Sequence, residues 1–181
     1  MQSQFVTDII EKYYPHDDDL RRLLLKHSRD VANKALSIVD HHPELGLQRQ
    51  FVEDCAMLHD IGIFKTHAPS IFCNGTEPYI RHGVEGAALV RAEGLELYAG
   101  VCERHTGAGI SRQQVQEQSL PLPLADYIPI TMTEQVVCYA DKFYSKSHPN
   151  RVRTVEQAAH SLSKFGADGV ERFMHWASLF E

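Results

Sequence analysis

The segment MLHDIGIFKTH, residues 57–67, places a histidine and an aspartate side by side directly after an apolar run. On an expected helix, His59 continues the apolar stripe of Cys55 and Leu58, and Asp60 lies about 100° further round the axis. A buried charge there is costly unless it is paired. At a helix end, however, both side chains can converge on one ion, and the glycine at position 62 allows the chain to turn away.

Two further polar residues fall on the apolar faces of expected helices. His27 shares a face with Leu24 and Val31, where a core histidine with one hydrogen-bonded nitrogen is the ordinary explanation. Asp141 shares a face with Val137, and an unpaired buried carboxylate costs several kcal/mol or takes up a proton. Asp141 therefore needs either an arginine from another part of the chain or a metal ion.

Two more histidines lie on the inward faces of later helices. His105 follows Val101 and Cys102 at helical spacing, and His82 begins the helix RHGVEGAALVR, where an exposed histidine is also common. Each polar residue taken singly has a structural explanation, whereas one metal site satisfies all of them together. Imidazole and carboxylate ligands suit zinc, iron, manganese, nickel or cobalt. Six protein ligands exceed the needs of one tetrahedral ion, so we predict two divalent ions. The six candidate ligands are His27, His59, Asp60, His82, His105 and Asp141.

Helical periodicity dominates the elements that must position these residues, and the alternation typical of strands is nearly absent. Segments 61–79 and 106–130 are rich in glycine and proline and are expected to be loops, the second with a short helix inside. We therefore predict an all-α helical bundle in a single domain, 1–181, with C-terminal helices over 147–181 packing on the rest. Helices are expected at 4–13, 18–40, 48–60, 80–93, 95–105, 131–146, 153–165 and 168–179.

The composition of the chain indicates which binding partners and which cellular compartment are expected. The chain has 181 residues, of which 43% are apolar, and its net charge is −6, from 18 basic and 24 acidic residues. An acidic balance argues against long nucleic acid and against an anionic membrane surface, although a metal can reverse the local sign. The four cysteines form no C-x-x-C pair, and neither a signal peptide nor a membrane-spanning apolar run is evident. These features predict a reduced, cytoplasmic protein.

The order of the candidate ligands resembles the HD domain of metal-dependent phosphohydrolases. The strings HSRDVANKAL, AMLHDIG and CYADK are similar to that family's helices in the same order, over about residues 20–146. The histidines of RHGVEGAALV and ERHTG are similar to the extra ligands of the family's binuclear branch. The resemblance implies that Asp60 bridges two ions. It also implies that His27, His59 and Asp141 complete one ion, and that His82 and His105 complete the other.

The resemblance further implies hydrolysis of a phosphomonoester or phosphodiester by metal-activated water. The substrate is then a small phosphorylated metabolite or nucleotide, and Asp60 is the candidate base. Lys65 and Arg81 bracket the expected loop beside the site, so they rank first for phosphate binding, with Lys65 also a candidate catalytic residue. For any one basic residue, a solvated surface charge is the ordinary alternative. The candidate substrate-binding residues are Lys65, Arg81, Arg104 and Lys142.

The sequence departs from the family pattern in two places. Many members place a lysine directly after HDIG, whereas this chain has Ile63 there and its first lysine is Lys65. The GYP signature of the branch that cleaves cyclic dinucleotides is absent from RHTGAGIS, which argues against cleavage of cyclic di-GMP. Two other functions stay open: a di-iron oxygenase of the related binuclear branch, and a non-catalytic binding module stabilised by metal. A homodimer is also compatible with the sequence.

Overall fold

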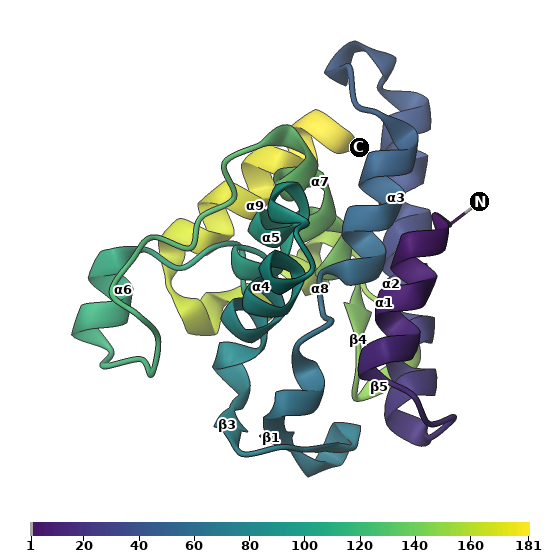
Figure 1. The fold of residues 1–181 in the computed structure, drawn as a ribbon. Coiled ribbons are helices and arrows are strands. Elements are labelled where there is room, and N and C mark those ends of the chain that lie inside the picture. The colour runs from purple at the N-terminus through teal and green to yellow at the C-terminus, as the bar shows by residue number, and fades with distance from the viewer. Residues whose placement is uncertain (1) are drawn as a thin grey trace.

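Nine α-helices carry most of residues 2–181, which are the residues described by the computed structural model (Figure 1). The predicted all-α class is therefore confirmed. The helices lie close to the expected ranges, including the short helix α6 inside the second predicted loop. Their bounds are α1 Gln4–Tyr13, α2 Asp19–His41, α3 Arg49–Leu58, α4 His82–Ala92, α5 Glu96–Glu103, α6 Arg112–Glu117, α7 Met132–Asp141, α8 Val155–Leu162 and α9 Ala167–Phe180.

The long helix α2 begins at a side-chain cap. Asp18 accepts a hydrogen bond from the Arg21 amide at 2.8 Å, which satisfies one of the free N–H groups of the first turn. Leu24, Val31 and Ala35 then form its buried face. This face packs along α3 and α7, so the helix that carries the first candidate ligand lies beside the helices that precede the other candidates.

The hydrophobic core lies among α2, α3, α5 and α7. α4 packs against α5 on one side, and α9 covers α7 and α8 on another. Leu58, Val136 and Phe173 are fully buried in this core. Figure 1 shows α6 projecting at the margin of the molecule, on the side away from α2 and α3. All four cysteines are buried and free. Among the described residues, no helix combines the length and apolar character required to cross a lipid bilayer.

Two small sheets replace parts of the predicted loop and of a predicted helix. β1 (Thr66–Ala68) pairs antiparallel with β2 (Cys73–Asn74) and parallel with β3 (Glu77–Pro78), within the predicted 61–79 loop. The expected helix over 131–146 is wrong beyond Asp141, where α7 ends. The chain turns into a hairpin of β4 (Tyr144–Ser145) and β5 (His148–Val152). The apolar stripe continued to Tyr144 and imitated a helix, whereas the following string SKSHPN favours a turn.

Candidate metal centre and adjoining pocket

All six candidate ligands lie in one buried cluster. His59 and Asp60 occupy the turn directly after α3, and neither is exposed to solvent. His27 comes from the middle of α2, and Asp141 is the last residue of α7. His82 begins α4. The sixth candidate ligand, His105, follows the end of α5. The structure thus brings together residues from five helices, while their role as metal ligands stays a prediction.

The Asp60 carboxylate stands between two groups of imidazoles. Its Oδ2 atom lies 3.3 Å from His27 Nε2 and 3.2 Å from His59 Nε2. Its Oδ1 atom lies 3.3 Å from His105 Nε2 and 3.6 Å from His82 Nε2. Each oxygen therefore faces a different pair of histidines, an arrangement suited to a carboxylate that bridges two cations.

Three of the histidines are held by their other ring nitrogen. The Nδ1 atom of His59 donates to the Ala56 carbonyl at 2.6 Å. His82 Nδ1 donates to the carbonyl of residue 79 at 2.7 Å, and His105 Nδ1 donates to that of residue 102 at 2.7 Å. Because a carbonyl only accepts, Nδ1 carries a hydrogen in each of the three, and Nε2 is the ring nitrogen that faces the cluster. This is the second hydrogen bond that metal-bound histidines ordinarily make.

The histidines of the cluster differ in charge, and the two nearest each other, His82 and His105, are neutral. His82 Nε2 and His105 Nε2 lie only 2.9 Å apart, and with both Nδ1 atoms protonated two lone pairs face each other. Burial, and then the neighbouring His105, lower the pKa of His82 to about 3. Burial opposes the charged form of His59 too, but Asp60 and Asp141 raise its pKa to about 9. The His82 side thus consists of neutral imidazoles that need a cation between them.

Several ligand atoms at the centre of the cluster have no hydrogen-bond partner. Among residues 2–181 the buried His59 Nε2 and Asp60 Oδ1 atoms make no hydrogen bond of normal geometry, whereas Asp60 Oδ2 forms an ion pair with Lys146. Ligand atoms of His27, His59 and Asp141 lie within 4.8 Å of one another, as do those of His59, Asp60 and His105. Buried polar atoms without partners are costly, and a set of imidazoles and carboxylates matches divalent transition metals. The residues present therefore fit the metal centre that the sequence predicts.

A further cation reaches the centre from the β4–β5 hairpin. Lys146 Nζ lies 2.6 Å from Asp60 Oδ2, and only 12% of this side chain is exposed. Burial would lower the pKa of Lys146, but the Asp60 carboxylate and its neighbours raise it well above 10.5. Sequence reasoning missed this residue because position 146 was placed at the end of a helix. The turn signal in SKSHPN was the available indication of its different position.

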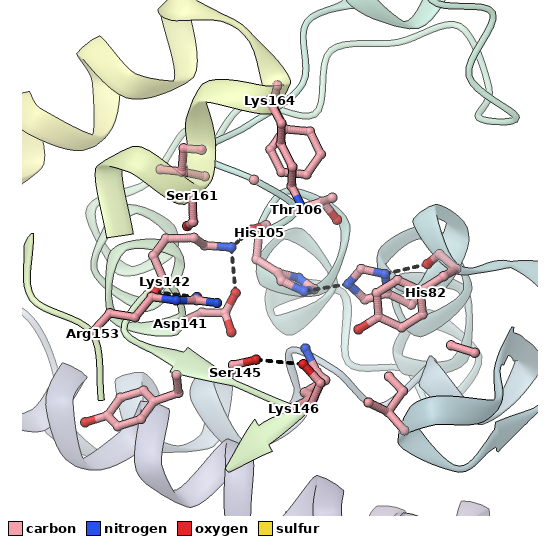
Figure 2. A pocket seen from close by; sticks show the side chains of 18 of the residues that line it. His82, His105, Thr106, Asp141, Lys142, Ser145, Lys146, Arg153, Ser161 and Lys164 are labelled. Carbon is pink, nitrogen blue, oxygen red and sulfur yellow. Dashed lines mark hydrogen bonds and ion pairs between the residues drawn. The ribbon is translucent and has the colours of Figure 1, made fainter. Parts of the chain in front are cut away.

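An open pocket adjoins the cluster and has a volume of about 420 Å³ (Figure 2). This volume lies within the range of small-molecule sites, about 300–1,000 Å³. Three of the candidate ligands line it, together with apolar side chains such as Tyr79 and Phe165. Its basic lining residues are Lys142, Lys146, Arg153 and Lys164. The hairpin and the α8–α9 connection supply much of this lining, so the C-terminal segment completes the pocket.

Of the four basic residues predicted to bind substrate, only Lys142 lines this pocket. Its Nζ atom lies 2.6 Å from Asp141 Oδ2 and donates to the His105 carbonyl at 2.9 Å. Lys142 thus has the position expected of a phosphate-binding residue. It also neutralises one oxygen of a candidate ligand.

The structure does not bring the other three basic candidates to the pocket. Lys65 pairs with Glu85 at 3.2 Å, and Arg81 pairs with the same carboxylate at 2.9 Å. Arg104 makes two contacts of 2.7 Å with Glu134. These partners neutralise the basic residues away from the pocket lining. Arg81 pairs with Glu85, and also with Glu77 at 2.8 Å, at a separation of four residues, so these pairs could be predicted from local sequence.

Comparisons with known proteins identify the family and the fold of the chain. The HD domain family model matches residues 24–145. An uncharacterised protein of Methanocaldococcus jannaschii is 36% identical over 124 residues, covering 63% of this chain and 66% of that protein. A tRNA (cytidine(56)-2'-O)-methyltransferase of Picrophilus torridus is 31% identical over 144 residues, covering 74% of this chain. A protein of the same name in Thermoplasma volcanium is 29% identical over 139 residues, covering 76% of this chain.

This chain spans only 38% and 35% of the lengths of those two methyltransferases. The fold is similar to the HD domain of the phosphodiesterase PgpH of L. monocytogenes, with a TM-score of 0.52 and 14% identity over 98% of this chain and 96% of that one. A second structure of that domain, in complex with cyclic-di-AMP, has the same TM-score and 15% identity, over 98% of this chain and 94% of that one. The predicted all-α bundle of the HD type is confirmed, and the chain belongs to the HD domain family.

Proposed function

We propose that this protein is a metal-dependent phosphohydrolase acting on a small phosphorylated metabolite or nucleotide. The observation that carries the proposal is the position of Asp60, whose two oxygens face separate pairs of histidines. A pocket with basic side chains lies next to that arrangement, as a phosphate ester requires. An oxygenase acting on an uncharged substrate has no evident need for those cations.

The proposed ligands divide into two sets that share Asp60. His27, His59 and Asp141 would hold one divalent ion, and His82 and His105 would hold the other. Divalent ions bound in this way supply a nucleophilic water at neutral pH and neutralise charge on the phosphoryl group. In the reaction, an oxygen–phosphorus bond forms from water as the bond to the leaving group breaks. The proton that Asp60 takes from the water balances the proton gained by the leaving oxygen.

Lys142 and Lys146 contribute charge at the boundary between the cluster and the pocket. Each ammonium group lies 2.6 Å from a carboxylate oxygen of the candidate ligands. Both residues also line the pocket, where their remaining N–H groups can donate to phosphate oxygens. Lys142 therefore keeps the phosphate-binding role predicted from the sequence, and Lys146 takes the role predicted for Lys65, Arg81 and Arg104.

The test combines metal analysis with turnover. Protein purified without chelator is expected to contain two divalent ions per chain and to release phosphate or cleave a phosphodiester when Mn, Co, Ni, Zn and Fe are supplied in turn. The panel includes nucleoside monophosphates, sugar phosphates and cyclic-di-AMP. His82→Ala is expected to lower the metal content from two ions to one. His175→Ala, an exposed histidine on α9, is the matched control and should keep both ions.

Two outcomes would replace the proposal with the alternatives. Oxygen uptake by the iron-loaded protein without hydrolysis of any phosphate ester would indicate a di-iron oxygenase. Full metal occupancy without turnover on either the phosphate-ester or the oxygenase assay would indicate a metal-stabilised binding module.

A further inference from the structure

Charge in the pocket is divided between two different groups of basic residues. Lys142 and Lys146 each contact a carboxylate of the candidate metal centre at 2.6 Å. Arg153 and Lys164 line the same pocket, but neither forms an ion pair within the described part of the chain. The only carboxylate in the pocket lining is Asp141, which already contacts a lysine and a histidine. Among residues 2–181, the second basic pair is therefore matched by no anionic side chain.

Arg153 has donors available on the side facing the pocket. It follows β5, and one guanidinium nitrogen donates to the Lys142 carbonyl at 3.0 Å. Figure 2 shows that the Arg153 side chain lies beside Asp141 and Lys142. A guanidinium carries five N–H donors in a fixed fork, so most of them stay available for a carboxylate or phosphate. The contact with Lys142 orients this fork without neutralising it.

Lys164 reaches the pocket from another part of the chain. It lies in the 3-10 turn Ser163–Phe165 that follows α8, and its Nζ atom is 4.9 Å from the centroid of the Phe165 ring. The Phe165 ring in turn lies near Gly107, two residues after a candidate ligand. Figure 2 places Lys164 on the side of Thr106 and away from Lys146. The pocket thus carries positive charge beyond the lysines that contact the metal-centre carboxylates.

Taking the phosphohydrolase function proposed above as the basis, we infer that the substrate is a phosphate ester carrying a second anionic group. One phosphate binds at the metal centre with Lys142 and Lys146. Arg153 and Lys164 bind the second group, a phosphate or a carboxylate, in the same pocket. A substrate with one phosphate would leave these two cations uncompensated. The volume of about 420 Å³ has room for a molecule of this size.

The experiment compares substrates that differ only in the second anion. The phosphate pair is adenosine 3',5'-bisphosphate and adenosine 5'-monophosphate, and the carboxylate pair is 3-phosphoglycerate and glycerol 3-phosphate. We expect at least one pair to show a kcat/KM preference of about tenfold or more for the doubly anionic member, as one charge-assisted hydrogen bond provides. The Arg153→Met, Lys164→Met double variant should reduce that ratio to near one.

Matched variants distinguish binding of the second anionic group from an effect on folding and from long-range electrostatic attraction. Arg151→Met removes the same charge from β5 at an exposed position outside the pocket, and it should keep the preference. Lys164 is exposed, so Lys164→Met alone tests the second group without disturbing the core. Equal losses on both members of each pair would overturn the inference, because they indicate electrostatic steering only. An absence of preference in the wild type would overturn it as well.

Binding measurements keep this inference separate from the proposed activity. Calorimetric titration of the wild type and the double variant with the same four compounds needs no turnover. If no phosphate ester is hydrolysed but the wild type still prefers a doubly anionic compound about tenfold and the double variant does not, the hydrolase proposal fails and the second anion site stands. Equal affinities within both pairs would overturn the second anion site, whatever the activity.

Discussion

Asp60 is the residue on which the candidate centre depends most. It is completely buried, and its carboxylate faces four imidazoles and one ammonium group. Burial alone would raise its pKa, but Lys146 and His59 hold the pKa well below the ordinary value for an aspartate. The side chain is therefore held as an anion, which the proposed bridging of two cations requires.

Replacing Asp60 with asparagine should remove these roles while retaining the shape of the side chain. Asp60→Asn is expected to lower the metal content at both positions and to reduce kcat by about 100-fold or more, since charge bridging and proton acceptance are both lost. Metal analysis and single-turnover hydrolysis on an accepted substrate measure the two effects. Asp54→Asn, at a buried aspartate that accepts from the Ser3 hydroxyl, is the control and should keep its metal. Wild-type rates in Asp60→Asn would refute the mechanism.

At the scale of elements, the turn after α3 must approach α4 very closely. Gly62 has a right-handed backbone with φ −86°, so it is not required for a positive φ. A Cβ atom at this position would instead collide with the Gly86 amide nitrogen and the His82 carbonyl oxygen. The glycine of HDIG therefore allows α4 to place its first residue, His82, beside Asp60. The sequence analysis explained Gly62 differently, as a residue that allows the chain to turn away from the helix.

Gly62→Ala should thus disturb stability and the metal centre together. We expect a loss of about 1–3 kcal/mol in the free energy of unfolding, as for other overpacked positions. Displacement of His82 should also lower occupancy of the ion assigned to His82 and His105. Urea denaturation and metal analysis provide the two readouts. Gly94→Asn is a suitable control, since a Cβ there meets no atom within 4 Å and asparagine tolerates its φ of +75°. Unchanged stability in Gly62→Ala would contradict the close-approach explanation.

The contact between α5 and α7 is held by a buried ion pair. Arg104 donates two hydrogen bonds of 2.7 Å to Glu134. The side chains are 19% and 8% exposed. Burial would raise the pKa of Glu134, but the arginine and the Ile130 amide lower it below 4.5. Because the folded-state pKa lies below the unfolded one, this stabilisation is present above about pH 4.5 and is lost as the pH falls through the folded pKa.

Arg104→Met should therefore affect stability in a pH-dependent way. At pH 7 we expect a loss of about 3–5 kcal/mol, because Glu134 is left buried without its partner. The difference from wild type should shrink as the pH falls, first as the buried, unpartnered Glu134 of the variant takes up a proton above about pH 4.5, and then as the wild-type carboxylate is protonated below it. Urea unfolding at a series of pH values measures this. A difference that stays constant down to acid pH would show that packing, and not the ion pair, accounts for the loss.

At the scale of the whole molecule, metal and fold are expected to stabilise each other. The ligands come from five helices that the unfolded chain does not hold together, so metal binding free energy becomes folding free energy. For one site with free metal at 100 times Kd, the stabilisation is about 2.7 kcal/mol, or roughly 5–10 °C in Tm for a chain of this size. Calorimetry before and after verified chelation should show such a decrease. Asp60→Asn, already poor in metal, should change little, and an unchanged wild-type Tm would argue against structural coupling.

Local patterns in the sequence determined the helices and the identity of the clustered residues. Helical periodicity placed His27 and Asp141 on inward faces, and the HDIG string located the turn after α3. These inferences succeeded because side-chain periodicity depends only on neighbours a few positions apart. The all-α class and the family resemblance follow from the same signals.

The identity of the pocket cations was decided only by the tertiary structure. Arg104 lies away from the pocket because Glu134, thirty positions later, accepts both of its hydrogen bonds. Lys146 reaches Asp60 because the chain leaves its helix after residue 141 and turns in a hairpin. Arg153 and Lys164 enter through elements beyond the segment that the family resemblance covered. Charges pair according to distance in space, and a single sequence does not contain that distance.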